Sequence, residues 1–375
     1  MENRDKIYIK NLLFKFNLFN TYELNNNDFE NLENMKSIFQ WSGQFPSYLI
    51  SYLFDKYCDK DDVVLDPFSG SGTVLYEAIR RNIGCCAIDI NPMAVELSKT
   101  YVFSKFDNKE RKRYIDLSEM LLQNMIKKFD SPFEIDKKIT DNDFGIIKKT
   151  LSEIKDPLIL NILLNVLMRF SIITEKNTIN GLYISFNLNK KIIENLPHVD
   201  KYIEVLTSDS KTLPIKNNVI DIIITSPPYP GIFDYYKNYK KIQYLLGKNI
   251  SKTRKKEIGQ NTKGSVSQNV LNYAKDMNKV FLEMRRVLKN KGRLILIINK
   301  NIKIKNKFLN FSYLLYVIAV ELSGFRLIEK QQRIFINRSG NKTFEEILHF
   351  VPSEYIKNNP GVFLNNVVSY ILEEK

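Results

Sequence analysis

Residues 63–73 decide the fold, and they read VVLDPFSGSGT. The first three residues are apolar and mostly β-branched, which is typical of a buried strand. After the strand end at Asp66, Gly70 and Gly72 lack a Cβ atom, so the backbone of the turn can take positive φ. A helix is then predicted over 73–81. A strand, a glycine-rich turn and a helix N-terminus in succession indicate a site for a nucleotide-like ligand.

Strands and helices alternate on both sides of this stretch. Proline at position 46 opens a predicted helix that runs to Tyr57. Further strands are predicted at 85–90, 203–207, 220–225 and 292–298, and a final β-hairpin pairs 325–335 with 346–351. This order predicts an α/β fold built around one mainly parallel sheet.

The pattern divides the chain into four parts. Residues 1–40 mix Asn and Asp with scattered aromatic residues, and we expect an irregular arm with short elements. The sheet domain covers 41–100 and 201–352, and a helical tail covers 353–375. Between them, 101–200 has helical periodicity and is longer than an ordinary connection, so it is predicted to be an inserted helical subdomain.

A second motif, TSPPY at 225–229, follows the apolar run 222–224. Because the carboxyl ends of parallel strands share one edge of a sheet, this loop and the glycine-rich turn can face one crevice. Ser226 Oγ and the Pro227 carbonyl can accept hydrogen bonds from an amino group, and the two prolines stiffen the loop. Tyr229 offers a ring on which a flipped base can stack.

Carboxylates end two further strands. Asp89 lies about twenty residues after the glycine-rich turn, where it can hold both hydroxyls of a ribose. Asp209 can accept from an adenine amino group, and Phe68 and Ile90 can pack against the ligand. A Gly-x-Gly turn alone is equally an ordinary tight turn, but these carboxylates favour a nucleoside-type ligand. The turn lacks the third glycine of a dinucleotide site.

The two motifs resemble those of the DNA amino-methyltransferases, which methylate an exocyclic base nitrogen with S-adenosylmethionine. The resemblance implies a Rossmann-like seven-stranded class I methyltransferase sheet with a helical insertion. In that family the catalytic motif often comes first in the sequence, whereas here the cofactor motif comes first. The location of the target-recognition region is therefore undecided, and the two candidates are the helical insertion 101–200 and the loop 247–267. The expected cofactor residues are Phe45, Pro46, Asp66, Pro67, Phe68, Gly70, Gly72, Thr73, Asp89, Ile90 and Asp209, and the expected catalytic residues are Ser226, Pro227, Pro228 and Tyr229.

The resemblance also bears on the substrate. Serine in the first position of the catalytic motif is commoner among N4-cytosine enzymes, so we expect methylation of cytosine N4 in double-stranded DNA. The expected setting is a restriction or defence system, with a possible cognate restriction endonuclease. An N6-adenine enzyme, an RNA base amino-methyltransferase and a catalytically silent DNA-binding subunit remain as alternatives. The sequence has no Pro-Cys pair, the nucleophile motif expected of a carbon-5 cytosine methyltransferase.

The net charge of +14 suits a polyanionic partner, although a lysine-rich composition also follows from an AT-rich genome. Basic residues gather in the loop after the catalytic motif and at the tip of the final hairpin, where a solvated loop is the alternative to phosphate contacts. The candidates for DNA binding are Lys252, Arg254, Lys255, Lys256, Arg338 and Lys342.

Composition argues against membrane and metal functions. The most apolar run, 158–173, carries Asn161, Asn165 and Arg169 every fourth residue, so a partly buried helix is expected rather than a membrane span. No Cys/His cluster has zinc spacing, so no metal site is expected. The three cysteines are expected to be reduced, and the charged N-terminus lacks the apolar core of a signal peptide, which favours a cytoplasmic location.

Overall fold

The computed structural model describes residues 3–29, 46–173, 177–231, 256–259, 264–336, 340, 342–354 and 360–373. Five residues of the expected sites lie outside these ranges: Phe45, Lys252, Arg254, Lys255 and Arg338.

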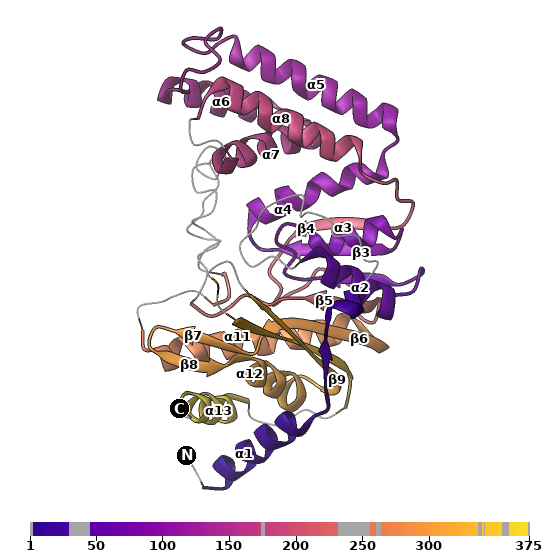
Figure 1. Ribbon diagram of the computed structural model, residues 1–375, viewed down its shortest axis with the longest axis vertical. Coiled ribbons are helices and arrows are strands. Elements are labelled where there is room, and N and C mark those ends of the chain that lie inside the picture. Colours follow the sequence, from indigo (N-terminus) through magenta and orange to yellow (C-terminus); the bar gives the residue numbers. More distant parts are fainter. Residues whose placement is uncertain are drawn as a thin grey trace.

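An eight-stranded sheet forms the centre of the molecule, in the order β1-β9-β10-β6-β5-β2-β3-β4 (Figure 1). Only β10 among the described strands of this sheet runs antiparallel to its neighbours, β6 and β9. The strands are β1 (Thr21–Leu24), β2 (Val63–Asp66), β3 (Gly84–Asp89), β4 (Ile203–Thr207), β5 (Ile220–Thr225), β6 (Leu288–Asn299), β9 (Phe325–Ile336) and β10 (Lys342–Pro352).

The strand order places a topological switch point between β2 and β5. From β2 the chain proceeds outward through β3 to β4, and it then returns to the other side of β2 to form β5 and β6. In an open α/β sheet, a crevice at the carboxyl ends of the strands opens where the order reverses. Both sequence motifs begin at these two strand ends, so the topology directs them to one place.

Helices cover both faces of the sheet, because successive strand residues point to opposite sides. Val64 faces one hydrophobic core and Leu65 faces the other, and both side chains are fully buried. The first core includes α2 (Ser47–Tyr57), α3 (Thr73–Arg80) and α4 (Pro92–Lys99). The second includes α1 (Asn3–Leu18), α11 (Val266–Val287), α12 (Phe311–Val317) with its π-helical continuation Ile318–Leu322, and α13 (Pro360–Glu373).

The chain between α4 and β4 is helical where it is described, as the sequence pattern predicts. It contains a 3-10 helix (Thr100–Lys105), α5 (Asn108–Ile126), α6 (Asp141–Glu153), α7 (Pro157–Ile173) and α8 (Ile179–Glu194), which extend away from the sheet (Figure 1). The apolar side chains of this insertion belong to the same core as those of α2, α3 and α4. The insertion therefore continues the layer of helices on that face of the sheet.

The N-terminal region and the sheet edge differ from the sequence-based expectation. In place of an irregular arm, the chain forms the sixteen-residue α1 and the strand β1, followed by a 3-10 helix (Asn26–Phe29). β1 pairs with β9 in parallel and adds an eighth strand to the seven expected. A second hairpin, β7 (Asn301–Ile304) with β8 (Lys307–Asn310), was also not expected. None of the described helices is long and apolar enough to cross a membrane.

Candidate active site

The two sequence motifs meet through a hydrogen bond. The Thr225 hydroxyl, at the end of β5, donates to Asp66 Oδ1, at the end of β2, over 2.7 Å. Asp66 also accepts from the Phe68 backbone N–H at 3.1 Å, and both Asp66 and Thr225 are almost fully buried. The two motifs therefore contact each other directly at the switch point.

The glycine-rich turn has the backbone conformation that the sequence requires. Gly70 and Gly72 have φ of +51° and +82°, which favours glycine, and Gly72 caps the N-terminus of α3. A Cβ atom on Gly72 would lie 2.8 Å from the Tyr101 ring and 2.9 Å from Ser98 Oγ. Ser98 Oγ in turn donates to the Gly70 carbonyl at 3.1 Å. Ser98 on α4 and Tyr101 at the start of the insertion therefore pack against the turn and hold it.

Asp89 closes the turn from the neighbouring strand. Its carboxylate accepts from the N–H groups of Gly70 at 3.0 Å and Asn91 at 2.8 Å. Burial raises the pKa of Asp89 to about 6, against the effect of these donors, and burial raises the pKa of Asp66 to about 7. Two poorly solvated carboxylates at the turn favour a ligand that brings hydroxyl donors or a positive charge.

The third expected carboxylate lies at the next strand end. The Ser208 N–H donates to the Asp89 carbonyl at 3.1 Å, and Ser210 Oγ donates to the Pro67 carbonyl at 2.6 Å, so the loop after β4 is joined to the turn. Asp209 accepts from the Lys211 N–H at 3.0 Å and keeps part of its surface exposed. Phe68, Ile90 and Thr73 are also partly exposed, as a wall around a ligand would require.

The catalytic motif is fixed through Tyr229. Its hydroxyl accepts from the Asn299 N–H at 3.1 Å, and its ring packs on Phe311 with centroids 5.0 Å apart. Burial, and next the Glu345 carboxylate, raise the pKa of Tyr229, whereas hydrogen bonds from Asn299 and Ser226 act in the opposite direction. If Ser226 donates its hydrogen to Tyr229, the lone pairs of Ser226 Oγ remain available to accept from a substrate amine.

Tyr229 differs from the expected free stacking surface, because it is only 9% exposed and belongs to a hydrophobic core. Its stacking role stays a prediction. Of the two prolines, Pro227 is buried and Pro228 is partly exposed. The loop is thus held by core packing in addition to the stiffness of its prolines.

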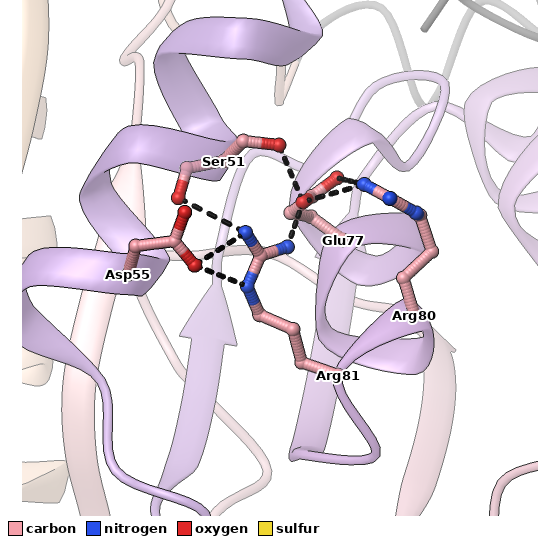
Figure 2. Close-up of polar contacts among 5 residues, drawn as sticks. All are labelled: Ser51, Asp55, Glu77, Arg80 and Arg81. Atoms are coloured by element: carbon pink, nitrogen blue, oxygen red, sulfur yellow. Dashed lines mark hydrogen bonds and ion pairs between the residues drawn. The ribbon is translucent and has the colours of Figure 1, made fainter. Parts of the chain in front are cut away.

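A polar network attaches α3 to α2 (Figure 2). Glu77 on α3 is 1% exposed and contacts Ser51 Oγ at 2.6 Å, Arg80 Nη1 at 3.0 Å and the Arg81 guanidinium. Arg81 reaches across to Asp55 on α2 at 2.7 Å. Pro46 is the N-cap residue of α2. The network therefore fixes the helix that begins at the glycine-rich turn against the helix that begins after Pro46, one of the expected cofactor residues.

Two described basic candidates lie in different surroundings. Lys256 is exposed, and its carbonyl accepts from Lys211 Nζ at 3.1 Å, next to Asp209. The short segment 256–259 returns to the catalytic motif, where the Gly231 N–H donates to the Gly259 carbonyl at 2.8 Å. Lys342 is exposed at the start of β10, with its ammonium 5.4 Å from the Phe344 ring centroid.

The residues around the turn fit S-adenosylmethionine by their chemistry. The hydroxyl of Ser69 is buried and has no hydrogen-bond partner, and it lies in the turn that would face the ligand. The positive end of the α3 helix dipole suits a carboxylate, and Asp66 suits an ammonium group. Within the described ranges, no group of three His, Cys, Asp or Glu side chains could hold a metal ion.

Sequence reasoning missed several residues that support the site. Thr225 stands beside Ser226, the expected catalytic serine, and its hydroxyl side chain at a buried strand end was a usable signal. Ser98, Tyr101 and Phe311 carried no such signal, because only the packing of distant elements brings them to the motifs. Asn299 acts through its backbone, which no side-chain pattern reveals.

Sequence comparisons agree with the geometry. Residues 2–100 match a family model described as DNA methylase, N6_N4_Mtase, which covers the glycine-rich turn and Asp89. The chain is similar to the Type II methyltransferase M.MjaII of Methanocaldococcus jannaschii, with 22% identity over 83% of this chain and 78% of the relative.

Solved structures with a similar course of the chain include two archaeal proteins. A protein described as a SAM-dependent methyltransferase from Methanosarcina mazei has 11% identity and a TM-score of 0.37, and the match covers 80% of this chain and 97% of that chain. The PH0226 protein of Pyrococcus horikoshii has 11% identity and a TM-score of 0.38, over 88% and 100%. The two sequence matches, together with both motifs at one switch point, support the DNA amino-methyltransferase family for this chain.

Proposed function

We propose that this protein transfers a methyl group from S-adenosylmethionine to the exocyclic N4 of cytosine in double-stranded DNA. The observation that carries the proposal is the hydrogen bond of 2.7 Å between Thr225 and Asp66. It joins the loop suited to the cofactor and the loop suited to the base amine at one point. A methyl donor and a methyl acceptor bound by these loops would be neighbours.

The chain's own residues would hold the cofactor at both ends. The N-terminus of α3 and the Ser69 hydroxyl suit the methionine carboxylate, and Asp66 suits its ammonium group. Asp89 suits the ribose hydroxyls and Asp209 the adenine amino group. When bound, S-adenosylmethionine supplies an electrophilic methyl group on its sulfonium.

The catalytic motif would prepare the base amine. The lone pair of such an amine is delocalised into the ring, so the amine must be drawn towards tetrahedral geometry and directed at the methyl group. Ser226 Oγ and the Pro227 carbonyl would accept hydrogen bonds from the two amine hydrogens. The hydrogen bond from the Asn299 N–H to the Tyr229 hydroxyl would hold the loop that carries these two acceptors. The reaction is then a direct displacement in which positioning supplies most of the acceleration.

The first position of the catalytic motif supports the choice of cytosine, since Ser226 stands where N6-adenine relatives more often have Asp or Asn. A restriction or defence setting, with a cognate endonuclease, is part of the same proposal. It is supported by the similarity to a Type II methyltransferase.

Isotope-labelled S-adenosylmethionine tests the proposal directly. The purified protein is incubated with unmethylated bacterial DNA and methyl-deuterated cofactor, and the nucleosides are then separated by mass spectrometry. Labelled N4-methylcytosine is the expected product, and labelled N6-methyladenine would move the substrate to adenine. No label in DNA, but label in an RNA sample treated in parallel, would contradict the choice of nucleic acid. A Ser226→Ala sample controls for contaminating enzymes.

A further inference from the structure

The β7–β8 hairpin is flanked in the sequence by two residues that contact Tyr229 of the catalytic motif. Asn299, whose N–H donates to the Tyr229 hydroxyl, lies two residues before the hairpin. Phe311, which packs on the Tyr229 ring, directly follows it. The Phe311 N–H donates to the Lys300 carbonyl at 3.0 Å and closes the base of the hairpin. A Cβ atom on Gly231, two residues after the motif, would lie 3.7 Å from Ile304. The hairpin therefore borders the candidate active site.

The two faces of this hairpin have opposite character. Ile302, Ile304 and Leu309 are buried in the core shared with Tyr229. Lys303, Lys305 and Lys307 are exposed, and none of the three forms an ion pair with a described residue. The segment 299–310, NKNIKIKNKFLN, contains four lysines and no acidic residue. Lys303 lies on the outer face, opposite Phe308, and Lys305 and Lys307 lie at the turn of the hairpin. The outer face and the turn together thus carry an uncompensated positive charge beside the catalytic motif.

An exposed aromatic ring distinguishes this hairpin from an ordinary solvated turn. Phe308 is 68% exposed, with the Lys303 ammonium 5.7 Å from its ring centroid, so an aromatic face lies among the lysines. Lys305 has φ of +54°, a left-handed conformation that favours Gly or Asn. Lysines interleaved with an exposed ring suit nucleic acid, whose phosphates pair with ammonium groups and whose bases stack on aromatic rings.

We propose that the β7–β8 hairpin is a DNA-binding element, in which Lys303, Lys305 and Lys307 hold backbone phosphates next to the target base. The inference rests on the proposed DNA methyltransferase function and adds a contact surface that lies outside the expected candidates. Phosphate contacts would place the duplex against the catalytic motif without reading its sequence.

The test compares two triple variants that each remove three positive charges. The hairpin variant carries Lys303→Gln, Lys305→Gln and Lys307→Gln. The control carries Lys6→Gln, Lys10→Gln and Lys15→Gln on α1, three exposed lysines at the lower end of the molecule in Figure 1, away from the hairpin. Binding to a short DNA duplex is measured by fluorescence anisotropy over a range of salt concentrations. Cofactor binding is measured by calorimetry on both variants.

Each phosphate contact that is lost reduces the slope of log affinity against log salt by about 0.9. The slope of the hairpin variant is expected to be smaller than that of the wild type by about two to three, whereas the control variant is expected to keep the wild-type slope. Both variants are expected to bind S-adenosylmethionine with the affinity of the wild type. A hairpin variant with the wild-type slope would overturn the inference, and methylation by the wild type would still stand. A wild type that binds no DNA would overturn the proposed function itself, and the hairpin proposal with it.

A single variant separates binding from folding. Lys305→Gly places the preferred residue at the left-handed position, so the thermal midpoint is expected to stay or rise, while DNA affinity falls and the salt slope decreases by about one. Lower stability with unchanged affinity would assign Lys305 to the turn alone. Tighter binding to an RNA duplex of the same sequence than to DNA would contradict DNA as the partner.

Discussion

At the scale of single residues, Ser226 separates a chemical role from a structural one. Ser226→Ala removes one acceptor for the amine but leaves the two prolines and the Tyr229 packing in place. Turnover is expected to fall about a hundredfold, with cofactor affinity near that of the wild type. Single-turnover methylation and calorimetry measure the two quantities. Full methyl transfer by the folded variant would remove Ser226 from the reaction.

The role of the Tyr229 hydroxyl is tested by Tyr229→Phe, which keeps the ring, and not by Tyr229→Ala, which removes it. Truncation to alanine opens a cavity beside Phe311, so its losses would combine stacking with stability. Phenylalanine keeps the ring but leaves the Asn299 N–H without its acceptor. Turnover of Tyr229→Phe is expected to fall about tenfold, through a less ordered loop. Turnover equal to the wild type would show that the hydroxyl bond does not position the motif.

The buried carboxylates predict how cofactor affinity depends on pH. Asp66 and Asp89, with pKa values of about 7 and about 6, lose their charge near neutral pH in the ligand-free protein. A ligand that needs the charged forms is therefore expected to bind at least about tenfold more weakly at pH 5.5 than at pH 7.5. Calorimetry at the two pH values measures this, and Asp66→Asn is expected to flatten the profile.

The stability of the ligand-free protein should move in the opposite direction. A carboxyl group whose folded-state pKa is raised stabilises the fold below its unfolded pKa, near 4, and this contribution is lost as pH rises through the folded pKa. From these two groups, the free energy of unfolding is expected to decrease between about pH 4 and pH 7. If cofactor affinity and the free energy of unfolding both increased with pH, the raised pKa values of Asp66 and Asp89 would be contradicted.

At the scale of elements, the Glu77 network holds the helix of the glycine-rich turn. Glu77→Ala leaves two arginines and Ser51 without their shared partner, and the arginines are about one fifth exposed. The free energy of unfolding is expected to fall by about 2–3 kcal/mol. Asp55→Ala is the control, because Asp55 is 53% exposed and its pair with Arg81 should contribute about 1 kcal/mol or less. Urea unfolding of both variants measures the difference.

At the scale of the whole molecule, the N-terminal segment completes the sheet. Phe16 on α1 is 1% exposed and packs on Tyr316 with ring centroids 4.7 Å apart. Phe16→Ala is expected to lower the free energy of unfolding by about 3–5 kcal/mol. Phe14 on the same helix is 62% exposed, so Phe14→Ala should change it by about 0.5 kcal/mol or less. Equal effects would mean that α1 does not belong to the folded core.

The polar stripe on α7 is explained by the packing of this helix against α4. The sequence shows Asn161 and Asn165 on one helical face, and the pattern alone suggests a face in partial contact with solvent. In the structure both residues are buried, and both donate to the Glu96 carbonyl of α4, at 2.7 Å and 2.9 Å. The stripe thus joins the insertion to the helix after β3. A helical period shows that a face is polar but not which neighbour covers it.

The sequence by itself determined the elements whose signals are local. Short apolar runs identified β2, β3 and β5, because a strand buried on both faces needs them. The turn at Gly70 and Gly72 follows from backbone freedom, and the carboxylates at strand ends follow from the topology of parallel sheets. These signals were enough for the fold class and for the meeting of both motifs.

Tertiary structure alone decided what depends on distant partners. β1 becomes a strand because β9, about three hundred residues away, offers its edge, although the segment 21–24 is short and half polar. Tyr229 is buried because Asn299 and Phe311 close on it from either end of an unexpected hairpin. A sequence pattern records how a segment is built, whereas burial and pairing depend on what the rest of the chain places beside it.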